Sequence, residues 1–568
     1  MRVHRGKAVL VGATALAIAI TGCSSSKTST TSNGNSSGKG TLIYGESTDF
    51  PENLNPLISA GNSTATANLE VRLFNGPFRI TPAIAYEADP DQVVGQPTSA
   101  LAGGQQVVTY KINPKAVWDD GVKITEKDYA YTWQAQKSAD PKTGCPALLG
   151  TTGYDQIASV TAGADDHTVV VKYQKGNPFP DWQSLFSPLL SAHVMDKGSN
   201  AADCAYITKG WATASGFPAG VTNGPWQLAK SDINVPSKTF TLTHNPKYWG
   251  ASPKLAKLVD AYIGSDPNTN VTVLQNQEAA MIYPQPQLDL VKNLKGLSSV
   301  TTEINFGVAF EHLDFNIATP GLSDVRVRQA IALAIDRKAL VQATVGQFSD
   351  KATVLGNRLL MTNQGGYVNN GTAYDAQNIA KAKQLIQAAG GVMGQGGIYS
   401  IKGKPLSFAV ETTQNNPLRD QTIATIANQV KAAGIKLTEK PDPNIFGDTT
   451  QPTSLAAHGY QLALFAWVGG PSLSSNASIY QTGGGQNYTG GGDKTADGFL
   501  KQMTSATTTD AEKAAANAAD KQLWTDMFTL PLYQKPTLLA FDNTYTGIAD
   551  NATQAGPLWN SEGFAVKS

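Results

Sequence analysis

The chain has 568 residues, and its 44 basic and 44 acidic side chains give a formal net charge of zero. This balance, without a dense cluster of Lys and Arg, argues against a nucleic-acid-binding protein. The length favours two to four domains, and no apolar run after the N-terminal segment reaches the ~18 residues expected of a membrane-spanning helix.

The N-terminal segment has the pattern of an export signal. Basic residues precede an apolar run from Ala8 to Ile20, and Cys23 directly follows a Thr-Gly pair. The run is shorter than the ~20 residues of a membrane-spanning helix, which favours a secretory signal. The Cys in this position resembles the bacterial lipobox, which implies removal of residues 1–22 and lipid attachment to Cys23. We therefore expect an exported protein anchored to the outer face of the cell membrane. An ordinary secretory signal with a chance Cys is the alternative.

Residues 23–40 are rich in Ser, Thr, Gly and Asn and carry almost no apolar side chains. A segment of this composition cannot bury enough apolar surface to order itself, so we predict a disordered tether. Gly34 to Lys39 resembles a phosphate-binding loop but is one residue too short, and no strand precedes it. Nucleotide binding there is therefore rejected.

Strand-like and helix-like segments alternate over most of the remaining chain. Alternating or β-branched patterns predict strands at 41–46, 107–112, 168–173 and 435–437. Capping residues and apolar periodicity predict helices from 125 to about 137, 323 to about 344, 375 to 389, 419 to 433, and 509 to about 528. Two of these helices end in Gly and lead into strands, which indicates an α/β fold.

The sequence shows no local pattern of catalysis or metal binding. Its six His residues do not lie at metal-ligand spacing, and no Gly-x-Ser-x-Gly elbow occurs. We therefore predict no metal, no cofactor and no enzymatic activity. Catalytic acids can lie far apart in sequence, so an exported hydrolase stays an alternative, as does an adhesion protein.

Two cysteines remain in the exported part of the chain, Cys145 and Cys204. An even pair in an oxidising compartment favours a disulfide, and two buried free thiols are the alternative.

Four longer patterns occur in a fixed order along the chain, and together they carry a family resemblance. They cover residues 117–129, 223–228, 244–250 and 324–337. In this order they resemble the extracytoplasmic solute-binding proteins of the dipeptide and oligopeptide ABC importers, solute-binding family 5. The resemblance extends from about residue 41 to the C-terminus.

This resemblance implies an α/β fold of the periplasmic-binding-protein type, class C cluster, with two lobes that close on ligand by a hinge. Lobe I is expected at 41–308 together with 533–568, and lobe II at 309–532. A small subdomain of lobe I, about 79–222, would carry both cysteines. The expected partners are a captured oligopeptide and the permease and ATPase subunits of an importer, and we expect a monomer.

The resemblance also indicates where ligand binds. From the first lobe it implies Tyr44, Glu46 and Ser47. From the second it implies the wall Phe465, Ala466, Trp467, Val468, Gly469 and Gly470, with Asn487 and Tyr488 nearby. Trp467 would offer a flat apolar face, and the glycines would let backbone approach the ligand.

One position departs from the family pattern. Peptide-binding members commonly carry an acidic residue about three positions after this Trp, where it pairs with the α-ammonium of the peptide. Here that position is Gly470, so no charge-assisted contact is available there. Either another acid such as Glu46 takes the role, or the ligand has no free amine. Blocked peptides, oligosaccharides, siderophore-like compounds and metal chelates are therefore alternative ligands to an oligopeptide.

Overall fold

The computed structural model describes residues 38–58, 61, 63–137, 145, 148, 152–447 and 449–567. The predicted signal peptide, Cys23 and most of the predicted tether lie outside the described residues. Within the described part of the chain, no helix combines the length and the apolar character needed to cross a membrane.

A single large sheet runs through the described chain, and two long strands form its middle. These are β13 (Val300–Phe315) and β20 (Thr529–Asp542), which pair antiparallel. On one side of the pair lie β12 (Met281–Ile282), β1 (Thr41–Glu46), β11 (Lys257–Tyr262), β10 (Thr239–His244), β8 (Trp226–Gln227) and β9 (Ile233–Asn234). On the other side lie β19 (Leu462–Val468), β17 (Ser407–Thr412) and β18 (Lys436–Pro441).

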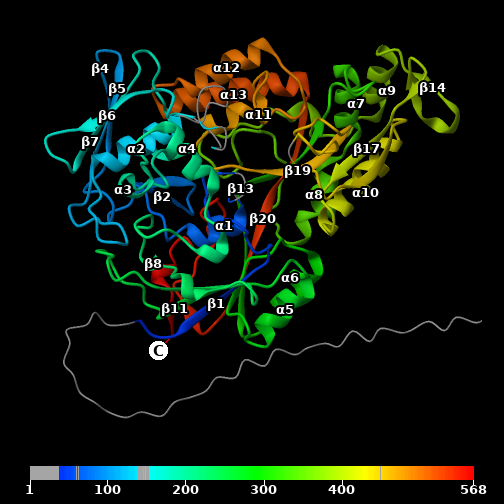
Figure 1. Ribbon diagram of the computed structural model, residues 1–568. Coiled ribbons are helices and arrows are strands. Elements are labelled where there is room, and N and C mark those ends of the chain that lie inside the picture. The colour runs from blue at the N-terminus through cyan, green and yellow to red at the C-terminus, as the bar shows by residue number, and fades with distance from the viewer. Residues whose placement is uncertain are drawn as a thin grey trace, which may run out of the picture. The chain divides into compact units, whose positions relative to one another are not determined.

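The two halves of this sheet therefore come from different parts of the sequence, and β13 and β20 connect them (Figure 1). We call the side with β1 the first half and the side with β19 the second half. Two strands that cross between halves are the arrangement expected of a hinge. The division into lobes at 308/309 and 532/533 falls within these two strands and stays a prediction.

The second half contains the predicted helix–Gly–strand units. β17 and β18 pair in parallel, and α10 (Pro417–Lys431) connects them. Gly434 follows this helix with a φ of +77°, a left-handed conformation that favours glycine. The helices α7 (Val325–Ala334), α8 (Arg337–Ala343) and α9 (Ile379–Ala388) contribute to the same apolar core as β17 and β19. The α/β class is confirmed in these elements.

The prediction of one continuous helix from 323 to about 344 is wrong, because the segment forms two helices, α7 and α8. Ile335 has extended backbone (φ −94°, ψ 122°), and Asp336 begins α8 by accepting a hydrogen bond from the Ala339 amide at 2.9 Å. The break turns the Arg337 side chain into the interior, where it donates to the Leu355 carbonyl and pairs with Asp375. A buried guanidinium needs such partners, and these partners are remote in sequence.

The other predicted elements are present, the strands at 41–46 and 168–173 with the predicted ends and the rest with shifted ends. The helix expected at 375–389 begins only at Ile379, because Asn378 accepts from the Lys381 amide as its N-cap. The remaining predicted elements are α2 (Glu126–Lys137), α13 (Thr509–Asp526), β5 (Gln105–Lys111) and β7 (Thr168–Tyr173).

The region of the predicted small subdomain has a sheet and a core of its own. β4 (Thr98–Ala102), β5, β7 and β6 (Ile157–Ala162) form an antiparallel sheet, and β2 (Phe78–Thr81) pairs with β3 (Ala85–Ala88). Trp118, Tyr110 and Phe186 are among the fully buried side chains of this core. Other residues of this stretch, such as Ile207, belong to the core of the first half, and the small subdomain at about 79–222 stays a prediction.

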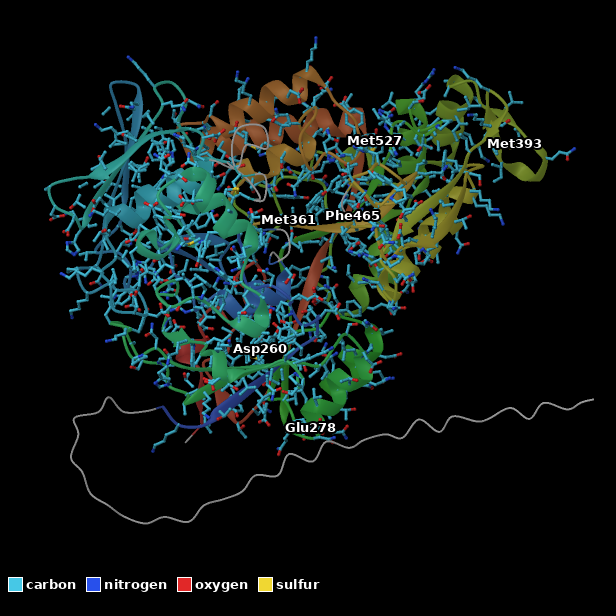
Figure 2. The ribbon with its side chains drawn as sticks, viewed as in Figure 1. Asp260, Glu278, Met361, Met393, Phe465 and Met527 are labelled. Carbon is cyan, nitrogen blue, oxygen red and sulfur yellow. A yellow bond between two sulfur atoms is a disulfide. The ribbon has the colours of Figure 1, made fainter. Side chains whose placement is uncertain are left out.

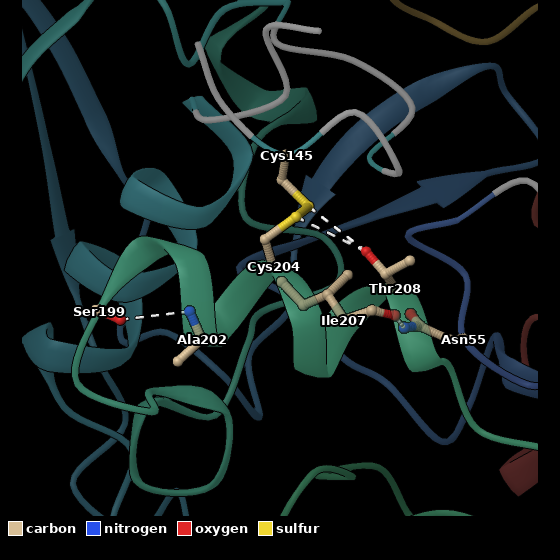
Figure 3. The surroundings of a disulfide bond; sticks show 7 residues. All are labelled: Asn55, Cys145, Ser199, Ala202, Cys204, Ile207 and Thr208. Atoms are coloured by element: carbon tan, nitrogen blue, oxygen red, sulfur yellow. Dashed lines mark hydrogen bonds between the residues drawn. A yellow bond between two sulfur atoms is a disulfide. The ribbon is translucent and has the colours of Figure 1, made fainter.

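A disulfide joins Cys145 to Cys204 in this region (Figure 3). Cys204 belongs to α4 (Asn200–Lys209), whose N-cap Ser199 accepts from the Ala202 amide. The bridge therefore ties α4 to the segment that follows α2.

Further helices are α1 (Thr64–Glu70), α3 (Ala192–Met195), α5 (Pro267–Gln275), α6 (Leu288–Lys295), α11 (Ala477–Tyr480) and α12 (Lys494–Thr504). Further short strands are β14 (Val392–Met393), β15 (Tyr399–Ile401), β16 (Lys404–Pro405), β21 (Tyr545–Thr546) and β22 (Ala565–Val566).

Candidate ligand-binding site

The end of β19 emerges from the core at the predicted wall. The strand is buried from Leu462 to Phe465, becomes partly exposed at Ala466 and Trp467, and leaves Val468 55% exposed. The Gly469 amide then donates to the Val308 carbonyl at 3.1 Å, which extends the pairing with β13 by one bond. The apolar run is therefore a core strand whose last residues reach the surface of the second half.

A cavity of about 430 Å³ lies against this wall. Trp467, Val468, Gly469 and Gly470 line one side of it. The facing side comes from the predicted small subdomain and includes Phe78, Ile80, Tyr86, Tyr154, Phe179 and Leu185. The volume suits a small organic ligand, and the cavity lies between segments from the two predicted lobes.

The lining of this cavity is aromatic, aliphatic, hydroxyl and amide in character. Gln136, Gln486 and Gln554 supply amides, and Ser184 and Ser187 supply hydroxyls. Among the described residues that line it, no side chain is Asp, Glu, Lys, Arg or His. Such groups bind a ligand through apolar contact and neutral hydrogen bonds rather than ion pairs.

The ring of Trp467 is less free than we expected. It lies nearly parallel to the ring of Tyr488, with centroids 5.7 Å apart, and to that of His312 at 6.1 Å. Phe465 meets it edge-on. Its Nε1 is buried and has no hydrogen-bond partner among the described residues. Protein therefore covers part of the ring that we expected to face ligand.

Gly470 has room for a side chain. A Cβ built at this position meets nothing among the described residues within 4 Å, and its φ lies outside the left-handed region. At Gly469 the nearest atom would be the Val308 carbonyl oxygen at 3.4 Å, an ordinary contact. Neither glycine is required by backbone strain, so their contribution to the site is open space beside the main chain.

Asn487 and Tyr488 lie in a packed loop rather than a solvated one. The Asn487 amide donates to the carbonyls of Gln481 and Gly491 at 2.9 and 2.7 Å, which closes the loop on itself. The Tyr460 hydroxyl donates to the Tyr488 carbonyl at 2.7 Å. The loop therefore supports Trp467 through the Tyr488 ring.

Tyr44, Glu46 and Ser47 lie elsewhere. All three are buried, and none lines the 430 Å³ cavity. Tyr44 donates to the Glu46 carboxylate at 3.3 Å, and Ser47 donates to Asn270 at 2.7 Å. Burial, followed by the nearby Glu46 carboxylate, raises the pKa of the Tyr44 hydroxyl.

The two predicted groups are thus on opposite sides of the central strand pair. Tyr44 pairs with Asp260 of β11, and Figure 2 shows Asp260 well separated from Phe465. The structure brings the second-half residues together with the small subdomain, and it leaves the first-strand residues in the core of the first half.

Sequence reasoning missed the contact of Asp181 with the loop that follows β19, beside the cavity. The Asp181 carboxylate accepts hydrogen bonds from the Ser472 hydroxyl at 2.6 Å and the Ser474 amide at 2.7 Å. Asp181 and Ser472 are 291 positions apart, so no local spacing could have paired them. The lining residues from 78 to 187 were missed for the same reason.

A larger, more open groove of about 860 Å³ lies on the small subdomain along α2, α3 and the start of α4. Its described lining includes charged side chains such as Lys123, Lys127 and Asp203, and it comes from one region of the chain. We prefer the smaller cavity because it is formed by segments from both predicted lobes, as binding by closure requires.

Known proteins of one family match this chain over most of its length. The family model for the middle part of bacterial extracellular solute-binding proteins, family 5, matches residues 98–490. The oligopeptide-binding protein OppA of Mycobacterium tuberculosis is 29% identical over 524 residues, which is 89% of this chain and 82% of that protein. A putative ABC transporter peptide-binding protein of Brucella abortus is 25% identical over 432 residues, 75% of this chain and 73% of that protein.

Solved structures resemble the whole described fold. The periplasmic EDTA-binding protein EppA has a TM-score of 0.84 at 24% identity, covering 94% of this chain and 98% of that one. The Bacillus subtilis oligopeptide-binding protein AppA, in complex with a nonapeptide, has a TM-score of 0.75 at 19% identity, covering 94% and 99%. At these identities the likeness shows the fold, and the two-lobe periplasmic-binding-protein fold expected from the sequence is confirmed.

Proposed function

The chain belongs to family 5 of the bacterial extracellular solute-binding proteins, and on this premise we propose that it captures oligopeptides between its two halves and delivers them to an ABC importer. Its role is to bind a solute for an ABC transporter, and it is not an enzyme. The finer proposal concerns the ligand and its place, the cavity between Trp467–Gly470 and the small subdomain.

The single observation that carries the peptide proposal is the surface-exposed end of β19 beside an uncharged cavity. A receptor for varied peptides must hold the common main chain and tolerate many side chains. The strand end at Val468 and the open backbone at Gly470 offer main-chain groups. The aromatic and amide lining offers contacts that do not select one side-chain charge.

A metal chelate is the main competing ligand. One similar structure is that of the EDTA-binding protein EppA, and another is that of NikZ of Campylobacter jejuni in complex with Ni(L-His). A multiply charged carboxylate chelate is held best by Arg and Lys. The neutral character of the described lining residues favours a peptide over such a chelate. The aromatic rings of the lining also suit an oligosaccharide, so an oligosaccharide pool is tested beside the peptides.

Export and anchoring are part of the proposal. A family of extracellular proteins fits an exported location. We propose that residues 1–22 are removed, that Cys23 carries lipid on the outer face of the cell membrane, and that the monomeric receptor meets its permease and ATPase partners there. Mass spectrometry of the mature N-terminus tests the anchor: a chain that begins elsewhere or carries an unmodified Cys23 contradicts it.

Thermal unfolding with ligand pools tests the ligand class. Binding to the folded state alone stabilises it by about 2.7 kcal/mol at a hundredfold excess over the dissociation constant. We expect a pool of hydrophobic and neutral oligopeptides to raise the melting temperature, and Fe(III)-EDTA and an oligosaccharide pool to leave it unchanged. A rise with the chelate or the oligosaccharides alone would overturn the peptide proposal.

A further inference from the structure

One contact joins the two sides of the ligand cavity directly beyond the Gly469–Gly470 wall. Asp181 follows the small subdomain's sheet and lies in the segment whose Phe179, Ser184 and Leu185 line the cavity. Its carboxylate reaches the loop after β19, where it accepts from the Ser472 hydroxyl and the Ser474 amide at 2.6 and 2.7 Å. Asp181 is 8% exposed, so these bonds are shielded from water.

A second carboxyl group meets Asp181 at the same place. Glu512, in the first turn of α13, is 3% exposed, and the Ser474 hydroxyl donates to it at 3.4 Å. Burial first, and then the charge of Asp181 and a hydrogen bond to it, raise the pKa of Glu512 to about 9. At neutral pH the Glu512 carboxyl is therefore protonated and donates its proton to the Asp181 carboxylate.

Among the described residues, the other titratable groups at this contact are Tyr86 from β3 and Lys513 from α13. Both line a small cavity of about 180 Å³, which Asp181 and Glu512 also line. Burial first, and then the charge of Asp181, raise the pKa of the Tyr86 hydroxyl, so this phenol is neutral at neutral pH. Lys513 opposes the effect of Asp181 on Glu512 but does not cancel it.

We propose that Asp181, Ser472, Ser474 and Glu512 form a latch that holds the ligand cavity closed, and that the latch engages only while Glu512 carries its proton. The inference rests on the proposed function, because a cavity that closes on a ligand must also open. Opening separates Asp181 from the loop and hydrates both carboxyl groups. The Asp181 charge disfavours a second charge on Glu512, so deprotonation of Glu512 favours the open form.

The sign of the pH dependence follows from linkage. In the open form Glu512 returns to an ordinary Glu pKa of about 4.3. Between that value and the closed-form value of about 9, closing takes up one proton. The closing equilibrium therefore falls about tenfold for each unit of rise in pH within this window, and it is independent of pH below it.

Hydrogen exchange of the Ser474 amide measures the latch without any ligand. This amide donates to Asp181 in the closed form and is released on opening. Pulsed exchange of the mature protein between pH 6 and 9, corrected for the intrinsic rate and resolved to that amide, gives the opening equilibrium. We expect its protection to fall about tenfold per pH unit in the natural protein.

Two variants separate the latch from general effects of pH. Glu512→Gln replaces the carboxyl by an amide that donates to Asp181 at every pH, so protection of Ser474 should lose its pH dependence. Asp510→Asn, an exposed acid in the same helical turn, is the matched control and should keep the natural slope. Asp181→Asn should lower protection at every pH.

The latch would be overturned if protection of the Ser474 amide did not depend on pH in the natural protein. It would also be overturned if this pH dependence were unchanged in Glu512→Gln. An amide that is unprotected at every pH would overturn it as well. Because the readout needs no ligand, failure of peptides to stabilise the protein would contradict the proposed function while leaving this result intact.

Discussion

Replacement of Gly470 by Asp places an acid at the position where the family resemblance implies one in peptide-binding members. The substitution should fold, because a Cβ there meets nothing among the described residues within 4 Å and the φ needs no glycine. Gly470 lines the cavity proposed to hold ligand, so the new carboxylate enters that cavity. It can then pair with the α-ammonium of a peptide.

The expected gain follows from the kind of contact formed. A hydrogen bond to a charged group contributes about 1.5–3 kcal/mol net. Because each 1.4 kcal/mol is tenfold in affinity, a peptide with a free amino terminus should bind about 10- to 100-fold tighter to the variant. An N-acetylated peptide has no ammonium group, so its affinity should stay the same or fall slightly as the carboxylate is desolvated.

Calorimetric titration of one hydrophobic pentapeptide, free and N-acetylated, into the natural protein and Gly470→Asp measures the difference. Gly470→Asn is the matched control, since it fills the same space without charge. Equal gains for both peptides, or the same gain in Gly470→Asn, would refute the argument that this position sets recognition of the amino terminus. No change for either peptide would place the amino terminus elsewhere.

Three further outcomes follow from the contacts. Reduction of the Cys145–Cys204 disulfide, whose partners are 59 positions apart, should cost about 4 kcal/mol of unfolding free energy in the chain-entropy model; coincident urea curves with and without reductant would contradict this. Asp520→Ala leaves the buried Arg358 guanidinium without its carboxylate partner and should lower the free energy of unfolding by about 3–5 kcal/mol. Denaturant unfolding measures this loss, and an unshifted midpoint would contradict it. Trp467→Ala removes a lining ring and should weaken peptide binding about tenfold, with far-UV circular dichroism retained; unchanged affinity would mean that the ring serves the core alone.

Local patterns predicted the elements because the forces that form them are local. The helix from Glu126 and the strand from Thr41 follow from capping residues and side-chain alternation within a few positions. The continuity of the helix after Ser323 could not be judged in this way. Its break at Ile335 depends on carbonyls and an acid that meet Arg337 from remote parts of the chain.

The candidate site also has a part that local sequence indicates and a part that depends on the packing of distant segments. The strand that ends in a glycine pair was readable from adjacent residues, whereas the assignment of Phe465 to Gly470 to ligand came from the family resemblance and stays a prediction. The facing residues, such as Tyr154 and Phe179, come from a subdomain hundreds of positions earlier, and only the packing of the chain brings them to Trp467. Asp181, which bonds the loop after β19 from 291 positions away, was unrecognisable because this contact depends on that packing.

A crystal structure of the mature protein with the ligand that co-purifies after mild extraction tests the central claim most directly. The account predicts a peptide between the two halves, in contact with Trp467 and the backbone of Gly469 and Gly470 on one side and with the small subdomain on the other. A ligand of another class, or a peptide bound beside Tyr44 and Glu46 without contact to Trp467, would contradict it.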